Sequence, residues 1–188
     1  MGFIRQKVFL TAFSITGIFI IYFGIKIAEK YEEKFEVEIA EKIEEKISAG
    51  KIILTADLPN FVQESDFETI DWERKAVKFG DIGIIGNENK SGVIGADMPS
   101  LNGQKWMWHL WGIENTKNTK LTIVGFHKES QTVHQILIDD WTTELSSANN
   151  GADAHIPSSV KIPESGEWAI LLYTDEKLFD ILVYEIKD

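Results

Sequence analysis

The chain has 188 residues, no cysteine and a net charge of −11. The lack of cysteine excludes disulfide bonds, thiolate zinc sites and a cysteine nucleophile. Residues 1–50 carry seven basic and eight acidic side chains, whereas residues 51–188 carry 12 basic and 22 acidic ones. A body this acidic repels phosphate backbones, so we expect no nucleic-acid partner.

The first predicted element is a membrane anchor. The 18 residues "VFLTAFSITGIFIIYFGI" at 8–25 hold no charge, and a helix of that length covers about 27 Å of a hydrocarbon core of about 30 Å. Arg5 and Lys7 precede the run, and no small-residue cleavage site follows it. The pattern predicts a transmembrane signal anchor at 8–25 after a cytoplasmic tail at 1–7. The alternative is a buried helix of a soluble domain.

The orientation of this anchor decides where the body lies. The short basic N-terminus favours the cytoplasm for residues 1–7, although three lysines, Lys26, Lys30 and Lys34, follow the span. We expect a single-pass protein of the cell membrane whose C-terminal domain is extracytoplasmic. The membrane is then its first partner, through residues 8–25.

Residues 26–50 are predicted to form an amphipathic, charged helical stalk. Apolar residues recur every four positions from Ile27 to Ile47, with Glu and Lys between them. This spacing advances about 40° per step, so the apolar stripe winds around the helix and does not form a straight coiled-coil seam. Gly50 is suited to end the helix.

The remainder of the chain is predicted to be all-β. Short β-branched and aromatic runs alternate with turn clusters such as "NENKSG" and "ANNGAD". This pattern predicts an antiparallel, immunoglobulin-like sandwich at 76–188. Runs such as "EWAILLY" are apolar on both faces, so some strands need a second cover. Residues 51–75 are the expected extended covering segment, with Phe61, Phe67 and Trp72 in a polar context.

Three stretches carry a resemblance to a known family: "KWMWHLWG" (105–112), "VGFHKES" (124–130) and the segment 150–186. They resemble uncharacterised, lipoprotein-like extracytoplasmic proteins of Bacillus-type Gram-positive bacteria. The closing pattern of this segment also resembles the end of bacterial immunoglobulin-like domains. The resemblance covers about residues 76–188 and implies the outside orientation and the sandwich, but no catalytic residues. The chain departs from the lipoprotein members because it has no lipobox cysteine.

The stretch "KWMWHLWG" divides into two faces in strand geometry. Trp106 and Trp108 are expected to fill the core. Met107, His109 and Trp111 share the second face, which is covered by the chain's own segment or exposed as an aromatic platform for sugar rings. Trp141 from "DDWTT" is a further candidate for this platform, which makes these four residues the predicted ligand-binding set: Trp111, His109, Met107 and Trp141.

A metal site is the weaker prediction. Asp153 and His155 fall on one side of an extended segment, and His109, His127 or His134 could join them. The histidines lack the spacing that would mark such a site, and structural or surface roles are the alternative. The sequence also lacks a Gly-x-Ser-x-Gly elbow. We expect no cofactor.

The leading functional hypothesis is a membrane-anchored, extracytoplasmic β-sandwich of the cell envelope that binds a protein or a cell-wall glycan and is not an enzyme. One alternative is a metal-dependent or glycan-acting envelope enzyme that uses His109, Asp153 and His155. Another is a structural component of an envelope or spore assembly, in which an apolar face meets another chain.

Overall fold

The computed structural model describes residues 25–42, 50–95 and 103–187, and the chain divides into two compact units, residues 1–49 and 50–188. In the first unit, residues 25–42 are helical, and the apolar side chains of their four-residue repeat, such as Tyr31 and Phe35, are exposed. The predicted anchor at 8–25 lies, apart from Ile25, outside the described residues. Within the described residues, no helix is both long and apolar enough to cross a membrane.

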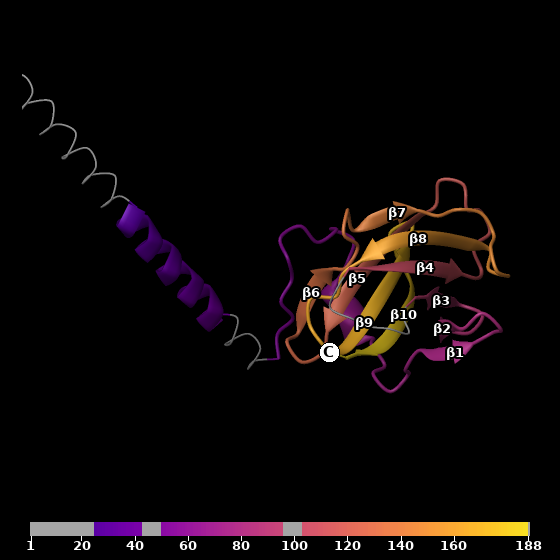
Figure 1. Ribbon diagram of the computed structural model, residues 1–188, viewed down its shortest axis with the longest axis horizontal. Coiled ribbons are helices and arrows are strands. Elements are labelled where there is room, and N and C mark those ends of the chain that lie inside the picture. The colour runs from indigo at the N-terminus through magenta and orange to yellow at the C-terminus, as the bar shows by residue number, and fades with distance from the viewer. Residues whose placement is uncertain (1–24, 43–49, 96–102, 188) are drawn as a thin grey trace, which may run out of the picture. The chain divides into compact units, whose positions relative to one another are not determined.

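The second unit consists of two antiparallel sheets (Figure 1). The β4 sheet has five strands in the order β1-β2-β3-β4-β8, which are β1 (Val77–Phe79), β2 (Ile84–Asn87), β3 (Ser91–Ile94), β4 (Gln104–Leu110) and β8 (Ala154–Val160). The β5 sheet has the order β10-β9-β5-β6, with β7 also paired to β5, and its strands are β5 (Lys120–His127), β6 (Thr132–Gln135), β7 (Thr142–Glu144), β9 (Gly166–Thr174) and β10 (Lys177–Ile186). The predicted antiparallel β-sandwich is therefore confirmed.

The core lies between the two sheets. Trp106 and Trp108 of β4 are completely buried there, and Trp168 of β9 meets them from the β5 sheet. Rings of this size bury about 150–250 Å² each, which at about 25 cal/mol per Å² stabilises the fold by roughly 4–6 kcal/mol per ring as an upper estimate. The indole N–H of Trp108 donates to Ser158 Oγ over 2.7 Å. The predicted core face of "KWMWHLWG" is confirmed.

The outer face of the β5 sheet is covered by residues 58–72, which include the short helix α2 (Glu64–Glu68). Phe61 meets Tyr173 edge-on at 5.6 Å, and Phe67 lies 4.9 Å from Phe126. Asp66 accepts hydrogen bonds from the Gln63 N–H and from the Tyr173 hydroxyl, each over 3.0 Å. This cover explains why β5 and β9 are apolar on both faces.

The chain joins the sandwich just before this cover. Ile53 forms a parallel bridge with Thr132 of β6. Its N–H donates to Gln131 O over 2.8 Å, and its carbonyl accepts from the Val133 N–H over 3.0 Å. The first residues of the body are therefore fixed to the β5–β6 hairpin.

A buried carboxylate links the two sheets. Asp180, in a bulge of β10, accepts hydrogen bonds from Asn87 Nδ2 of β2 over 3.0 Å and from the Ser91 hydroxyl of β3 over 2.6 Å. Burial, followed by the charge of Asp180, raises the pKa of Tyr184. Because a buried charge needs such partners, Asn87 and Ser91 stabilise the position of β3 against β10.

Candidate functional site

The second face of "KWMWHLWG" is partly covered by the chain's own loop at 149–153. Asn150 and Gly151 both have positive φ, 51° and 81°, and Asn149 and Ala152 exchange two backbone hydrogen bonds across them. An Asn-Gly pair suits such a two-residue turn, because both residues tolerate the left-handed region. The turn therefore forms from local sequence.

Three consecutive turn residues contact three alternate residues, two in β4 and one just after its end. The contacts are Asn149 Nδ2 to Met107 Sδ at 3.7 Å, Asn150 Nδ2 to His109 Nε2 at 3.0 Å, and Gly151 O accepting from Trp111 Nε1–H at 2.7 Å. Next along the chain, Asp153 Oδ2 accepts from the Gly112 N–H over 2.7 Å. The loop is thus fixed on the face that the sequence singled out.

His109 is completely buried, with 0% of its surface exposed. Its Nδ1 lies 3.2 Å from the Met107 carbonyl oxygen, which can only accept, so Nδ1 carries the proton. Nε2 is then free to accept from the Asn150 amide. Burial lowers the pKa of His109; the bond to Met107 opposes this, and the charge of His155 adds to it. A neutral imidazole therefore fixes which end of the Asn150 amide faces it.

Trp111 is half-buried, and its ring is held from several sides. It lies 6.3 Å from the His109 ring in a stacked arrangement and 5.7 Å from Phe79 at 59°. Its indole N–H is occupied by Gly151 O. The ring is therefore fixed in orientation and presents carbon surface rather than a free donor.

Phe79 and Trp111 line an open pocket of about 310 Å³ on the outer side of the β4 sheet. The turn after β1, the start of β2, the turn after β2 and the 149–153 loop complete its walls with two carboxylates, two amides and aliphatic surface, from Asp81, Ile82, Ile84, Glu88, Asn89 and Asn150. Half of the Ile82 side chain is exposed. We call this the Trp111 pocket.

The structure brings three of the four predicted ligand-binding residues together. Met107, His109 and Trp111 follow one another along the face that the 149–153 loop contacts. Trp141 lies elsewhere: it is 6% exposed in the cluster on the outer face of the β5 sheet, and its indole N–H donates to Asp57 Oδ2 over 3.2 Å. It therefore does not extend the aromatic surface of Trp111.

The two predicted metal ligands have protein partners. Asp153 Oδ2 accepts from the Gly112 N–H, and His155 Nδ1 lies 2.6 Å from the Ser147 carbonyl oxygen. His155 is opposite His109 in the β4–β8 register. In the part of the chain that the structure describes, no group of three or more His, Asp or Glu side chains is arranged to hold a metal ion.

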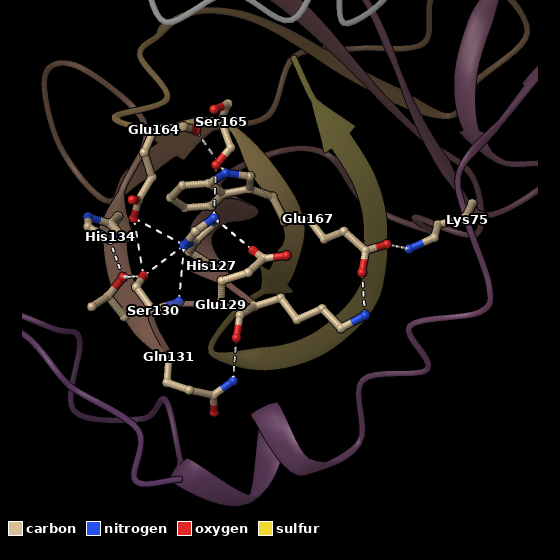
Figure 2. Close-up of polar contacts among 12 residues, drawn as sticks. Lys75, His127, Glu129, Ser130, Gln131, His134, Glu164, Ser165 and Glu167 are labelled. Carbon is tan, nitrogen blue, oxygen red and sulfur yellow. Dashed lines mark hydrogen bonds and ion pairs between the residues drawn. The ribbon is translucent and has the colours of Figure 1, made fainter. Parts of the chain in front are cut away.

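A second polar cluster surrounds His127 at the end of β5, and sequence reasoning did not assemble it (Figure 2). The His127 ring is 4% exposed and packs 4.9 Å from Trp168. Its Nε2 lies 3.0 Å from the Ser165 carbonyl oxygen, so Nε2 carries the proton. Nδ1 accepts from the Ser130 N–H over 3.3 Å. The Ser130 Oγ lies 2.7 Å from Nδ1, and its hydroxyl donates to Glu164 Oε1 over 3.1 Å.

Two carboxylates flank the same ring. Glu129 Oε2 lies 3.0 Å from His127 Nε2, and Glu164 Oε1 lies 3.1 Å from Nδ1. Gly166 closes the cluster: it has φ +126°, and a Cβ there would lie 2.4 Å from Nε2. We call these residues, with Ser130 and Ser165, the His127 cluster.

The His127 cluster places a hydroxyl, an imidazole and carboxylates in line, as hydrolases do. Here, however, the Ser130 hydroxyl donates to Glu164, and the His127 ring joins the β5–β6 turn to the turn before β9 through the Ser130 N–H and the Ser165 carbonyl. This bonding indicates that the cluster fastens two turns. The sequence marks the second of these turns by "PESG" (163–166), but nothing local pairs it with a segment almost 40 residues away.

Beside this cluster, Glu167 lies between two lysines. Lys75 and Lys128 each donate to its carboxylate. The bond from Lys128, followed by the bond from Lys75, lowers the pKa of Glu167. The network links the end of the covering segment to β9, and as an exposed ion pair it adds little stability.

Comparisons with known proteins identify one family and one related structure. A family described as "Domain of unknown function (DUF4871)" matches residues 61–184, which is more than half of the chain and includes the covering aromatics and the Trp111 pocket. No curated protein matches the sequence. The predicted resemblance to an uncharacterised family is confirmed by this match.

The related structure is a crystal structure described as a "Putative Lipoprotein from Bacillus anthracis". It is 23% identical to this chain, with a TM-score of 0.58, and the alignment covers 71% of this chain and 99% of that one. At this identity the likeness shows the fold alone. It agrees with the two-sheet body, whereas the immunoglobulin-like assignment stays a prediction.

Proposed function

The chain belongs to the DUF4871 family, a domain of unknown function, and for this member we propose an extracytoplasmic module that binds a glycan of the cell envelope at the Trp111 pocket. The observation that carries the proposal is the composition of that pocket, two oriented rings with carboxylates and amides around them. A sugar ring offers an apolar face and a rim of hydroxyl donors. Aromatic carbon and oxygen acceptors are the matching groups.

The shape of the pocket also favours a polymer over a small enclosed ligand. Its walls come from exposed turns, and its volume of about 310 Å³ is at the lower end of ligand pockets, about 300–1,000 Å³. A chain of sugars can rest one ring on Trp111 and extend past the turns. The 149–153 loop supports this role, because it fixes Trp111 before any ligand arrives.

Anchoring belongs to the same proposal. Residues 8–25 would hold the protein in the cell membrane, residues 26–50 would form the stalk, and residues 76–188 would be an immunoglobulin-like sandwich outside the cell. The exposed helical surface at 25–42 is compatible with such a stalk. Protease treatment of intact cells should remove the body; a body that stays protected until lysis would contradict the outside location.

Binding is tested with the full-length protein and short N-acetylglucosamine and glucosamine oligomers in titration calorimetry. We expect binding of at least one oligomer, weakened by Trp111→Ala by about tenfold or more, as the loss of about 1.4 kcal/mol of stacking would give. Trp141→Phe is the matched control, because Trp141 lies on the other sheet. The proposal is wrong if neither oligomer binds the wild-type protein, or if Trp111→Ala binds as well as Trp141→Phe.

A further inference from the structure

The charged side chains that line the Trp111 pocket are both acidic. The turn after β1 contributes Asp81 and the turn after β2 contributes Glu88, both exposed at the rim. Trp111 is not available as a donor, because its indole N–H is bonded to Gly151. The polar side chains that line the pocket around the two rings are therefore two carboxylates and two amides, while Lys78 lies close to Gly83 in the turn after β1 and Lys90 points to the Phe179 ring.

Asn150 adds a further acceptor through His109. The protonated Nδ1 of His109 faces the Met107 carbonyl, so Nε2 must receive the Asn150 amide N–H. This fixes the orientation of the amide and leaves Asn150 Oδ1 to accept from a ligand. His109 is thus a positioning residue: it does not line the pocket itself but selects the face that Asn150 presents.

Aromatic rings with nearby carboxylates are suited to bind ammonium groups. A cation is attracted to the face of an aromatic ring within about 6 Å of its centre. The turn after β2 itself makes such a contact, with Lys90 Nζ 3.6 Å from the centre of the Phe179 ring. The acidic character of residues 51–188 adds a long-range attraction for cations and repels anionic polymers.

We propose that the Trp111 pocket selects glycans that carry free amino groups, with the ammonium of a 2-amino sugar held between Asp81, Glu88 and Asn150 over the rings of Phe79 and Trp111. This inference rests on the proposed function and names its ligand class. N-acetylated sugars would use the rings but lose the charge contact.

The test compares glucosamine oligomers with N-acetylglucosamine oligomers of equal length, titrated calorimetrically into the full-length protein. We expect the glucosamine oligomers to bind about tenfold tighter or more at low ionic strength, with the preference shrinking as salt is added. Asp81→Asn combined with Glu88→Gln should abolish the preference, because it weakens binding of the glucosamine oligomer more than binding of the acetylated one. Glu144→Gln combined with Glu185→Gln, two exposed carboxylates on β7 and β10, is the charge-matched control and should keep the preference.

The outcomes separate this inference from the proposed function. Equal binding of both oligomers, or tighter binding of the acetylated one, overturns the amino-sugar assignment and leaves glycan binding intact. A double variant that keeps the wild-type preference also overturns the assignment. If trilysine binds as tightly as the glucosamine oligomer, charge alone is responsible and the glycan assignment fails. If neither oligomer binds the wild type, the proposed function fails as well.

Discussion

His109 and His127 are both buried histidines, yet their surroundings differ in kind. His109 contacts a carbonyl oxygen and an amide nitrogen, its proton sits on Nδ1, and it is linked to a pocket. His127 has its proton on Nε2, a carboxylate within 3.1 Å of each ring nitrogen, and bonds to two turns. Burial is therefore common to both histidines, and the groups that contact their ring nitrogens distinguish them.

The largest expected effect concerns the fastening role of the His127 cluster. Gly166→Ala introduces a Cβ at 2.4 Å from His127 Nε2 at a φ that disfavours side chains, so we expect a loss of about 2–5 kcal/mol in the free energy of unfolding from strain and overpacking. Gly151→Ala is the matched control: its φ is also positive, but no atom lies within 4 Å of the added Cβ, and a loss of about 1–2 kcal/mol is expected. Urea denaturation measures both.

Equal losses in the free energy of unfolding of the two glycine variants would contradict a fastening role for the His127 cluster. They would mean that the turn holding Ser165 can move away from His127 without further loss, and that the cluster does not fasten the two turns. Glycan affinity should be unchanged in Gly166→Ala wherever the protein is folded, because Gly166 belongs to the β5 sheet.

A smaller effect is expected from pH. Burial lowers the pKa values of His109 and His134 below 6.5 in the folded protein. The unfolded chain therefore binds more protons below pH 6.5, so this contribution to stability is complete above 6.5 and is lost as pH falls through the folded-state pKa values. We expect the free energy of unfolding to decrease between pH 7.5 and 5.5, by less than in Gly166→Ala.

His109→Gln sharpens this prediction, because it removes one of the two titrating rings while an amide can still bond Met107 O. The pH-dependent decrease should be smaller in the variant than in the wild type. An identical decrease in both proteins would show that His109 does not contribute to the pH dependence of stability.

Parts of this arrangement were predictable from the sequence. Strand alternation placed Trp106 and Trp108 inside, since side chains on a strand alternate regardless of what surrounds it. Apolar residues on both faces of β9 indicated a cover, and Phe61, Phe67 and Trp72 all pack on the outer face of the β5 sheet. These features depend on local period and composition, which a single sequence contains.

The contacts that make the sites depend on long-range register and were not predictable in the same way. The Asn-Gly turn was recognisable as a turn, but its position over Met107, His109 and Trp111 follows from the pairing of β4 with β8, in which His109 is opposite His155. Trp141 could not be assigned to a sheet, because periodicity does not tell which strands become neighbours. The His127 cluster likewise required the alignment of β5 with β9.

The bridge between Ile53 and β6 would bear force if the body is tethered through its N-terminal side. Tension from the tether would act on the two backbone hydrogen bonds that join Ile53 to Gln131 and Val133, next to the packed side chain of Ile52. Gln131 belongs to the same turn as Ser130, which His127 holds. The force would therefore act on the β5–β6 turn that His127 holds. The Trp111 pocket is on the β4 sheet, away from this turn.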